Sequence, residues 1–214
     1  RDAMVRLWKV ETGVLMQTYQ GHESCTFCAA WSGNGKLLAS GSKDKMLRIW
    51  DAAADTSISA PSPESPRCDG HTDSIYCLAR SPDCQFLASA GQDGTVHVWD
   101  GQTGALWRVL RGLGGWVRGL TWGPDSRHLV SGSRDGHVRL WDATSGDFLR
   151  CWEGHGEGVV CVAVDESGKH VASGSYDMTI RIFDMDSDDV LLVLRGHEDT
   201  VRCLSWSSDG MTLD

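Results

Sequence analysis

The chain has 214 residues, of which 41% are hydrophobic, so it is long enough to bury a sizeable core. Its formal net charge of −9 argues against broad attraction to nucleic-acid phosphates or anionic membranes, and no run of about 18 apolar residues suggests a membrane span. Eight cysteines are sparse for a chain of this length, so we expect free thiols and an intracellular location, cytoplasmic or nuclear.

The predicted elements follow one plan that repeats along the chain. Four blocks align without a gap: LLASGSKDKMLRIWD (37–51), FLASAGQDGTVHVWD (86–100), HLVSGSRDGHVRLWD (128–142) and HVASGSYDMTIRIFD (170–184). In each block, two stretches with alternating apolar residues flank a turn centred on an Asp, which predicts a pair of antiparallel strands. The start of the chain, RDAMVRLWK, aligns with the second half of a block.

A Gly-His marker and one more alternating stretch precede each block. The marker histidines are His22, His71, His155 and His197, and Leu113 fills the same slot in the remaining unit. A Thr-Gly or Ser-Gly turn and an apolar stretch follow RDAMVRLWK and two of the four blocks, and segments such as SGNG (32–35), SPDC (81–84) and ESGK (166–169) supply turn residues. Each unit therefore predicts a meander of four short strands, repeated along the chain.

The Gly-His marker, the LASGS-x-Asp motif and the Trp-Asp pair, at a period of 42 residues, resemble the WD-repeat β-propeller family. The resemblance implies an all-β fold of four-stranded antiparallel blades, with strands a to d running outward from the centre. We expect a partial blade at 1–20, blades at 21–69, 70–111, 112–153 and 154–195, and a partial blade at 196–214. Because both ends fall inside a unit, we expect part of a seven-bladed or larger ring.

The resemblance also implies a hydrogen-bonded tetrad in each blade, made of the marker His, a Ser of strand b, the Asp of the b–c turn and the Trp of strand c. The complete sets would be His22, Ser40, Asp44 and Trp50, and His71, Ser89, Asp93 and Trp99. Two sets lack a member. One has Leu113 in the His slot and consists of Ser131, Asp135 and Trp141. The other has Phe183 in the Trp slot and consists of His155, Ser173 and Asp177. Such a network would satisfy polar groups that are costly to bury alone.

The stretch SGSRDGHVRLWD (131–142) places a serine, an aspartate and a histidine close together, as in a hydrolase. His137, however, aligns with Met46, Thr95 and Thr179 of the other units and not with a marker His. Ser-Asp pairs that recur in four blades indicate a structural role, whereas a catalytic triad needs a single cleft. We therefore expect no catalytic residue; the alternative is an enzyme whose site lies outside the covered blades.

Motifs for cofactors and metals are incomplete. GLGGWVRG (112–119) lacks the third Gly of a dinucleotide-binding loop and the Lys of a phosphate-binding loop. Cys25 and Cys28 form a CxxC pair, but no second pair completes a zinc site. We expect no cofactor and no metal. Cys28, Cys77, Cys161 and Cys203 hold one equivalent strand position and are expected to be small core residues.

In a meander, the d–a and b–c connections share one end of the ring, which is the candidate binding face. The exposed positions there are Phe27, Lys43, Tyr76, Gln92, Trp116, Arg118, Arg134, Tyr176 and Arg202. Aromatic and Arg side chains predominate among them, and these residue types anchor protein interfaces, although an aromatic residue near a strand end is also typical of packing. We expect Trp116 and Arg118 to be the strongest anchor, because the glycine-rich run 112–115 before them allows their loop to adapt.

These patterns predict a non-catalytic scaffold that binds other proteins or peptides as a subunit of a multiprotein complex, without direct nucleic-acid contact or membrane insertion. The alternative within binding is a reader of a modified, for example phosphorylated, peptide.

An insertion, ADTSISAPSPESPRCDGH (54–71), is predicted to hold a strand at 56–60 and an exposed loop. Ser62 and Ser65 each precede a proline and resemble minimal phosphorylation sites, the alternative being an unmodified polar loop.

Overall fold

The computed structural model describes residues 2–52, 70–210 and 212–213. Its strands form five antiparallel sheets in chain order. The first sheet pairs β1 (Met4–Trp8) with β2 (Leu15–Gln20), and the second contains β3 (Thr26–Trp31), β4 (Leu37–Ser42) and β5 (Leu47–Asp51). The fourth strand predicted for that sheet, at 56–60, lies outside the described residues, as do Ser62 and Ser65.

Each of the other three sheets has four strands in the order of the chain. They are β6 (Ile75–Arg80), β7 (Phe86–Gly91), β8 (Val96–Asp100) and β9 (Leu106–Leu110); β10 (Val117–Trp122), β11 (His128–Ser133), β12 (Val138–Asp142) and β13 (Phe148–Trp152); and β14 (Val159–Val164), β15 (His170–Ser175), β16 (Ile180–Asp184) and β17 (Val190–Leu194). The predicted all-β class and the repeated four-stranded meander are confirmed.

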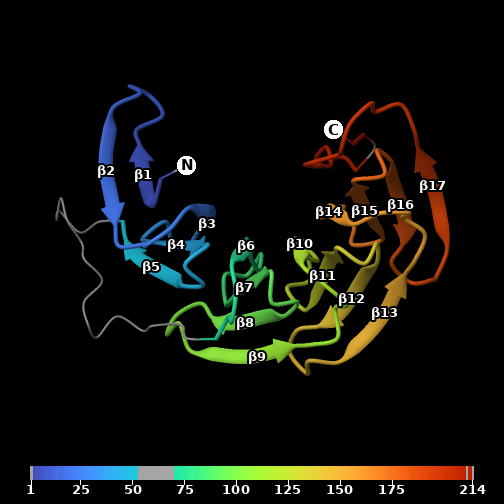
Figure 1. Cartoon of the computed structure of the whole chain (residues 1–214), viewed down its shortest axis with the longest axis horizontal. Coiled ribbons are helices and arrows are strands. Elements are labelled where there is room, and N and C mark those ends of the chain that lie inside the picture. The colour runs from blue at the N-terminus through green and yellow to red at the C-terminus, as the bar shows by residue number, and fades with distance from the viewer. Residues whose placement is uncertain (1, 53–69, 211, 214) are drawn as a thin grey trace.

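The sheets follow one another around an arc, as blades of a propeller do (Figure 1). The first strand of each complete meander lies on the inner side of the arc, where β6 contacts β10 and β10 contacts β14. The last strands, β9, β13 and β17, lie on the outer side. The connections between strands therefore collect at the two ends of the blades, and side chains that follow equivalent strands become neighbours.

Neighbouring blades are held together by apolar side chains from the alternating positions of their strands. Val96 and Val98 of β8 pack in one buried cluster with Val117 and Trp141 of the following blade. Trp152 of β13 and Phe183 of β16 lie in a second cluster, with ring centroids 5.6 Å apart. Because the sheets between two neighbours bury apolar side chains on both faces, burial of apolar area between blades is the main source of stability.

The equivalent cysteines differ in their surroundings. Burial raises the pKa of the Cys28 thiol to about 12 and that of Cys161 to about 11, and it also raises the pKa of Cys77. Cys203 is exposed, so its prediction as a core residue is wrong. The physical reason is local: residues 201–205 pair with no other strand among the described residues, so nothing covers the thiol.

Candidate protein-binding surface

Three of the candidate binding residues occupy the same special place in their strands. Phe27, Tyr76 and Arg118 each lie where the pairing of the innermost strand shifts by one residue, between Thr26 and Cys28, Ile75 and Cys77, and Val117 and Gly119. A bulge leaves the extra residue without a cross-strand partner and redirects its side chain. The bulges therefore turn these three side chains toward the end of the blades instead of into the seams between blades.

The redirected side chains meet residues from the b–c turns and form one connected surface. We define this cation-aromatic surface as Phe27, Tyr76, Trp116, Arg118, Arg134 and Tyr176. Ring centroids are 5.5 Å apart for Phe27 and Tyr76 and 6.1 Å apart for Tyr76 and Trp116. The surface thus runs continuously across several blades, although its members are far apart in the sequence.

Two guanidinium groups lie over these rings. The Arg118 guanidinium carbon is 5.0 Å from the Tyr76 ring centroid and 5.8 Å from each of the Trp116 and Tyr176 centroids. Arg134 lies 4.3 Å from the Trp116 centroid. Cations within about 6 Å of an aromatic face are attracted by the ring quadrupole. The rings hold both arginines in place, and their N–H groups remain available to a ligand.

A pocket of about 510 Å³ opens within this surface. It is lined by Trp116, Arg118, Arg134, Tyr176, Gly158 and Glu157. No carboxylate among the described residues forms an ion pair with Arg118 or Arg134, so the pocket offers two unpaired cations next to aromatic faces. Glu157 places one negative charge at the pocket and would oppose an anionic ligand on that side.

The remaining candidates lie at the margin. The Tyr76 hydroxyl donates to the Gln92 side-chain carbonyl, which holds the ring over its neighbours. Lys43 and Arg202 are exposed and belong to none of the ring or cation contacts described above. Sequence reasoning identified these residue types at one end of the blades, but it had no signal for which of them touch.

The tetrads lie beneath this surface. The Trp50 indole N–H donates to Ser40 Oγ at 2.8 Å, and His22 contacts Ser40 through Nε2 and Asp44 through Nδ1 at 2.8 Å each. An ionised Asp44 can only accept, so Nδ1 carries the proton and Nε2 accepts from the serine hydroxyl. Burial lowers the pKa of His22, although Asp44 opposes this shift, so the neutral ring completes the chain of donors.

The other complete set has the same geometry. His71 lies 2.8 Å from both Asp93 and Ser89, and Trp99 donates to Ser89 at 2.8 Å. Burial by itself would raise the pKa of Asp93, but the hydrogen bond and charge of His71 outweigh it and hold this pKa well below its usual range. The carboxylate therefore stays ionised and accepts a hydrogen bond from the His71 Nδ1–H.

The set that lacks a histidine has a different partner for its aspartate. Leu113 is 1% exposed and packs into the core, and Arg139 donates to Asp135 from Nη2 at 2.6 Å and from Nη1 at 3.2 Å. Trp141 still donates to Ser131 Oγ at 2.9 Å. The guanidinium thus replaces the imidazole, a substitution that the alignment of marker residues did not anticipate.

The set that lacks a tryptophan keeps its histidine. His155 lies 2.8 Å from Asp177 and 2.7 Å from Ser173, and Thr179 adds a contact of 3.3 Å to the same imidazole. Phe183 is fully buried and stacks on Trp152. Phe183 thus lacks the indole N–H donor of the other sets, but its ring contributes aromatic packing.

The residues of 131–142 do not assemble as a triad. The Ser131 hydroxyl contacts the Trp141 indole, Asp135 contacts Arg139, and His137 is directed toward Asp135 and Glu153 at 3.4 Å each. Because a nucleophilic serine must hydrogen-bond its base, this arrangement has the elements of a structural network and not those of acyl transfer.

His97 is a feature that the sequence analysis missed. It is 2% exposed, stacks on His71 with ring centroids 3.9 Å apart, and its Nδ1 has no hydrogen-bond partner among the described residues. Arginines occupy the equivalent position two residues before Trp50, Trp141 and Phe183, which was the available signal. His71, Asp93 and His97 lie close enough to hold a metal ion, but both nitrogens of His71 are already engaged by Asp93 and Ser89.

Comparison with known proteins places these features in a family context. The family model described as "WD domain, G-beta repeat" matches residues 13–51, 64–100, 104–142, 146–184 and 189–213, which together make up most of the chain. The described residues include no helix capable of crossing a bilayer.

Several curated proteins are similar over one or two repeats. The periodic tryptophan protein 2 homolog of Schizosaccharomyces pombe is 44% identical over 57 residues, 27% of this chain and 7% of that protein. The ribosome biogenesis protein WDR12 homolog of Nematostella vectensis is 47% identical over 55 residues, 25% of this chain and 13% of that protein. Coronin-7 of Rattus norvegicus is 38% identical over 50 residues, 23% of this chain and 5% of that protein. The matches therefore span a small part of each relative.

Proposed function

Because the chain belongs to the WD-repeat family of β-propeller proteins, we propose that it is a non-catalytic scaffold that binds other proteins through the cation-aromatic surface. The observation that carries this proposal is the continuous row of rings and guanidinium groups from the bulges and adjoining loops of neighbouring blades. Tyr, Trp and Arg provide most of the binding energy at protein interfaces. The relative named for ribosome biogenesis suggests an intracellular, cytoplasmic or nuclear assembly as the setting.

Trp116 and Arg118 are the proposed anchors, since both line the pocket and contact each other. Truncating either should cost at least about 2 kcal/mol of binding free energy. The test is quantitative affinity capture of cellular proteins on the full chain and on Trp116→Ala and Arg118→Ala, with the melting temperature measured for each variant.

Trp107 and Arg108 supply a matched control. They form the same kind of pair, with the Arg108 guanidinium 5.6 Å from the Trp107 centroid, on the outer strand β9. Trp107→Ala and Arg108→Ala should retain the partners that Trp116→Ala and Arg118→Ala lose. Capture that is unchanged in the Trp116 and Arg118 variants, or lost equally in all four, would refute the proposed surface.

A second candidate function is recognition of an anionic, for example phosphorylated, peptide. It is supported by the two unpaired arginines at the 510 Å³ pocket, because guanidinium groups bind phosphate through two parallel hydrogen bonds. The measurement is binding of a phosphopeptide library and its unphosphorylated copy to the chain and to Arg134→Gln. A preference for phosphate that disappears in Arg134→Gln and weakens with salt would support this function; equal binding of both libraries would reject it.

A further inference from the structure

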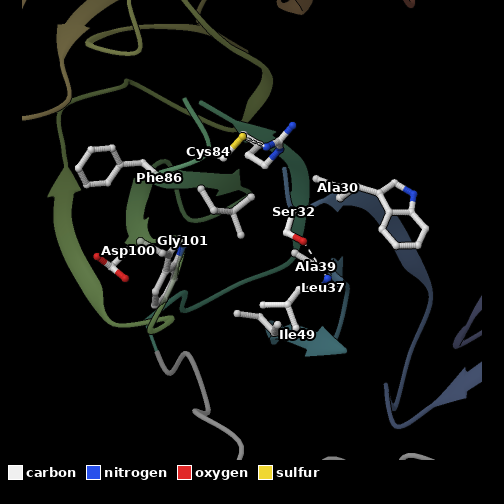
Figure 2. Close-up of a pocket in the computed structure, with 13 residues that line it drawn as sticks. Ala30, Ser32, Leu37, Ala39, Ile49, Cys84, Phe86, Asp100 and Gly101 are labelled. Atoms are coloured by element: carbon white, nitrogen blue, oxygen red, sulfur yellow. Dashed lines mark hydrogen bonds between the residues drawn. The ribbon is translucent and has the colours of Figure 1, made fainter. Parts of the chain in front are cut away.

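A second, smaller pocket lies in the seam between the sheet β3–β5 and the sheet β6–β9 (Figure 2). Its residues come from β3 to β5 of one sheet, from β6 to β8 of the other and from the turns after β3, β6 and β8, so it lies at the end of the blades opposite the cation-aromatic surface. Its volume is about 40 Å³. This is room for roughly three water-sized spheres, which suits a branched aliphatic group better than an aromatic ring.

The pocket lies beside a position whose residue type differs between units: Arg80 ends β6, whereas Trp122 ends β10 and Val164, which packs against the apolar core, ends β14. Trp122 ends β10, and Trp206 lies at the equivalent position of the last unit; their indole N–H groups donate to carbonyls of the preceding blade, Ala79 at 3.0 Å and Ala163 at 3.4 Å. Arg80 holds this position next to the pocket. A guanidinium on a flexible stem does not fill the seam as a flat indole does, so space remains beside Ala30.

The walls of the pocket are apolar. Leu37, Ala39 and Ile49 come from one sheet, and Phe86, Leu87 and Trp99 come from the other. Figure 2 shows Leu37 and Ile49 across the pocket from Cys84. Trp31, 41% exposed, lies at the rim. Moving an aliphatic side chain from water against such walls is favourable, because its apolar surface is removed from water.

One unpaired cation accompanies these walls. Arg80 contacts the Cys84 thiol through Nη1, and none of the carboxylates of the described residues forms an ion pair with it. Asp100 also lines the pocket, but its Oδ1 already accepts the backbone N–H groups of Gln102 and Thr103 and the Thr103 hydroxyl. The turn thus engages Asp100 Oδ1 and keeps Asp100 from Arg80, so among the described residues the guanidinium has no carboxylate partner and can pair with an anion from outside.

We propose that this seam pocket binds a protein segment that presents a branched aliphatic side chain next to a carboxylate. The aliphatic group enters the space that an indole fills in other seams, and the carboxylate pairs with Arg80. The apolar walls and the unpaired guanidinium together define this occupant, because neither a purely acidic nor a purely apolar segment satisfies both. The chain would then contact partners at both ends of its blades.

The probe is the capped tripeptide acetyl-Asp-Leu-Asp-amide, titrated into the full chain while amide chemical shifts are followed by NMR. Shifts are expected at the pocket, and N-ethylmaleimide should label Cys84 more slowly as the peptide binds. Replacing the peptide Leu by Ala should raise the dissociation constant about tenfold, and replacing both Asp residues by Asn about fivefold.

Two variants at one position test the argument. Arg80→Trp supplies the indole found in other seams, so it should abolish peptide binding while its melting temperature stays at or above that of the wild type. Arg80→Gln keeps much of the volume without the charge, so it should bind the Asp and Asn peptides equally. Lys169→Gln, a surface cation in the equivalent turn of another blade, is the matched control and should bind as the wild type does.

Each contrary result overturns the proposal. Undiminished peptide binding by Arg80→Trp would show that the peptide binds elsewhere. If the amide chemical shifts of the pocket residues in the wild type do not change, the pocket does not bind a segment of this chemistry. Binding of 4-methylpentanoate as tight as that of the tripeptide would make the occupant a small carboxylic acid and not a protein segment.

Discussion

At the scale of single residues, the buried polar groups of the tetrads serve stability. His71→Ala or Asp93→Ala should lower the free energy of unfolding by about 1 to 3 kcal/mol, because each leaves a buried partner without its hydrogen bond. His137→Ala removes a local contact of 3.0 Å to the Asp135 carbonyl and longer ones to two carboxylates, all partly exposed, and should change stability by less than about 0.5 kcal/mol. Urea unfolding of the three variants measures this difference, and an equal loss for His137→Ala would contradict the assigned roles.

His97 makes stability sensitive to acid. Burial and the charge of His71 lower the pKa of His97 to about 4, from an ordinary value of 6.5. The folded state therefore holds fewer protons than the unfolded state between these values, and stability contributed by neutral His97 is lost as pH falls from 6.5 toward 4. Two other charges face the same imidazole. The negative charge of Asp93 raises the pKa of His97 and opposes the shift, whereas the positive charge of Arg111 lowers this pKa further.

His97→Asn should consequently reduce the fall in urea midpoint between pH 7 and pH 4.5. Part of the fall should remain, because burial also lowers the pKa of His22 and His155. Circular dichroism at the two pH values makes the comparison. An identical fall in the variant would show that His97 does not bind protons differently in the two states.

At the scale of elements, side chains buried in the seams between blades carry more stability than side chains exposed on the outer strands. Trp152 of β13 is 1% exposed and stacks on Phe183, whereas Trp107 of β9 is 50% exposed. Trp152→Ala should therefore lower the free energy of unfolding by about 3 to 5 kcal/mol, and Trp107→Ala by less than about 1 kcal/mol. Guanidinium unfolding of both variants tests this ranking, which fails if the two losses are alike.

At the scale of the whole molecule, the blade that contains β17 presents an apolar face. Leu194 lies opposite Ile180 as Leu110 lies opposite Val96 and Trp152 opposite Val138. Leu110 and Trp152 are 2% and 1% exposed, but Leu194 is 38% and its neighbour Leu192 54% exposed. An exposed apolar strand favours association.

The 214-residue chain should therefore self-associate as its concentration rises. Leu192→Lys combined with Leu194→Lys should shift the equilibrium toward monomer, and Leu149→Lys, on the exposed outer strand β13, should not. Sedimentation velocity over a range of concentrations measures both. A monomeric wild-type chain at all concentrations would exclude this face as an association surface.

The sequence by itself determined the repeat, the strands and the pairs within each blade, because the alternation of apolar residues and the turn residues are local properties that one unit carries alone. It also pointed to the end of the blades where Phe27, Tyr76 and Trp116 gather. Only the tertiary structure decided which of these side chains touch, since bulges and the spacing of adjacent blades are not local.

The same distinction explains the features that the repeat pattern missed. Arg139 replaces the absent histidine because it lies across a turn from Asp135, and His97 stacks on His71 because two distant segments meet beneath Gly70, whose Cβ, if present, would lie 2.6 Å from His97 Nδ1. The seam pocket beside Arg80 arises only when one blade packs against the next. Contacts between units depend on residues from both, so they are settled by packing in three dimensions and not by the pattern of either unit alone.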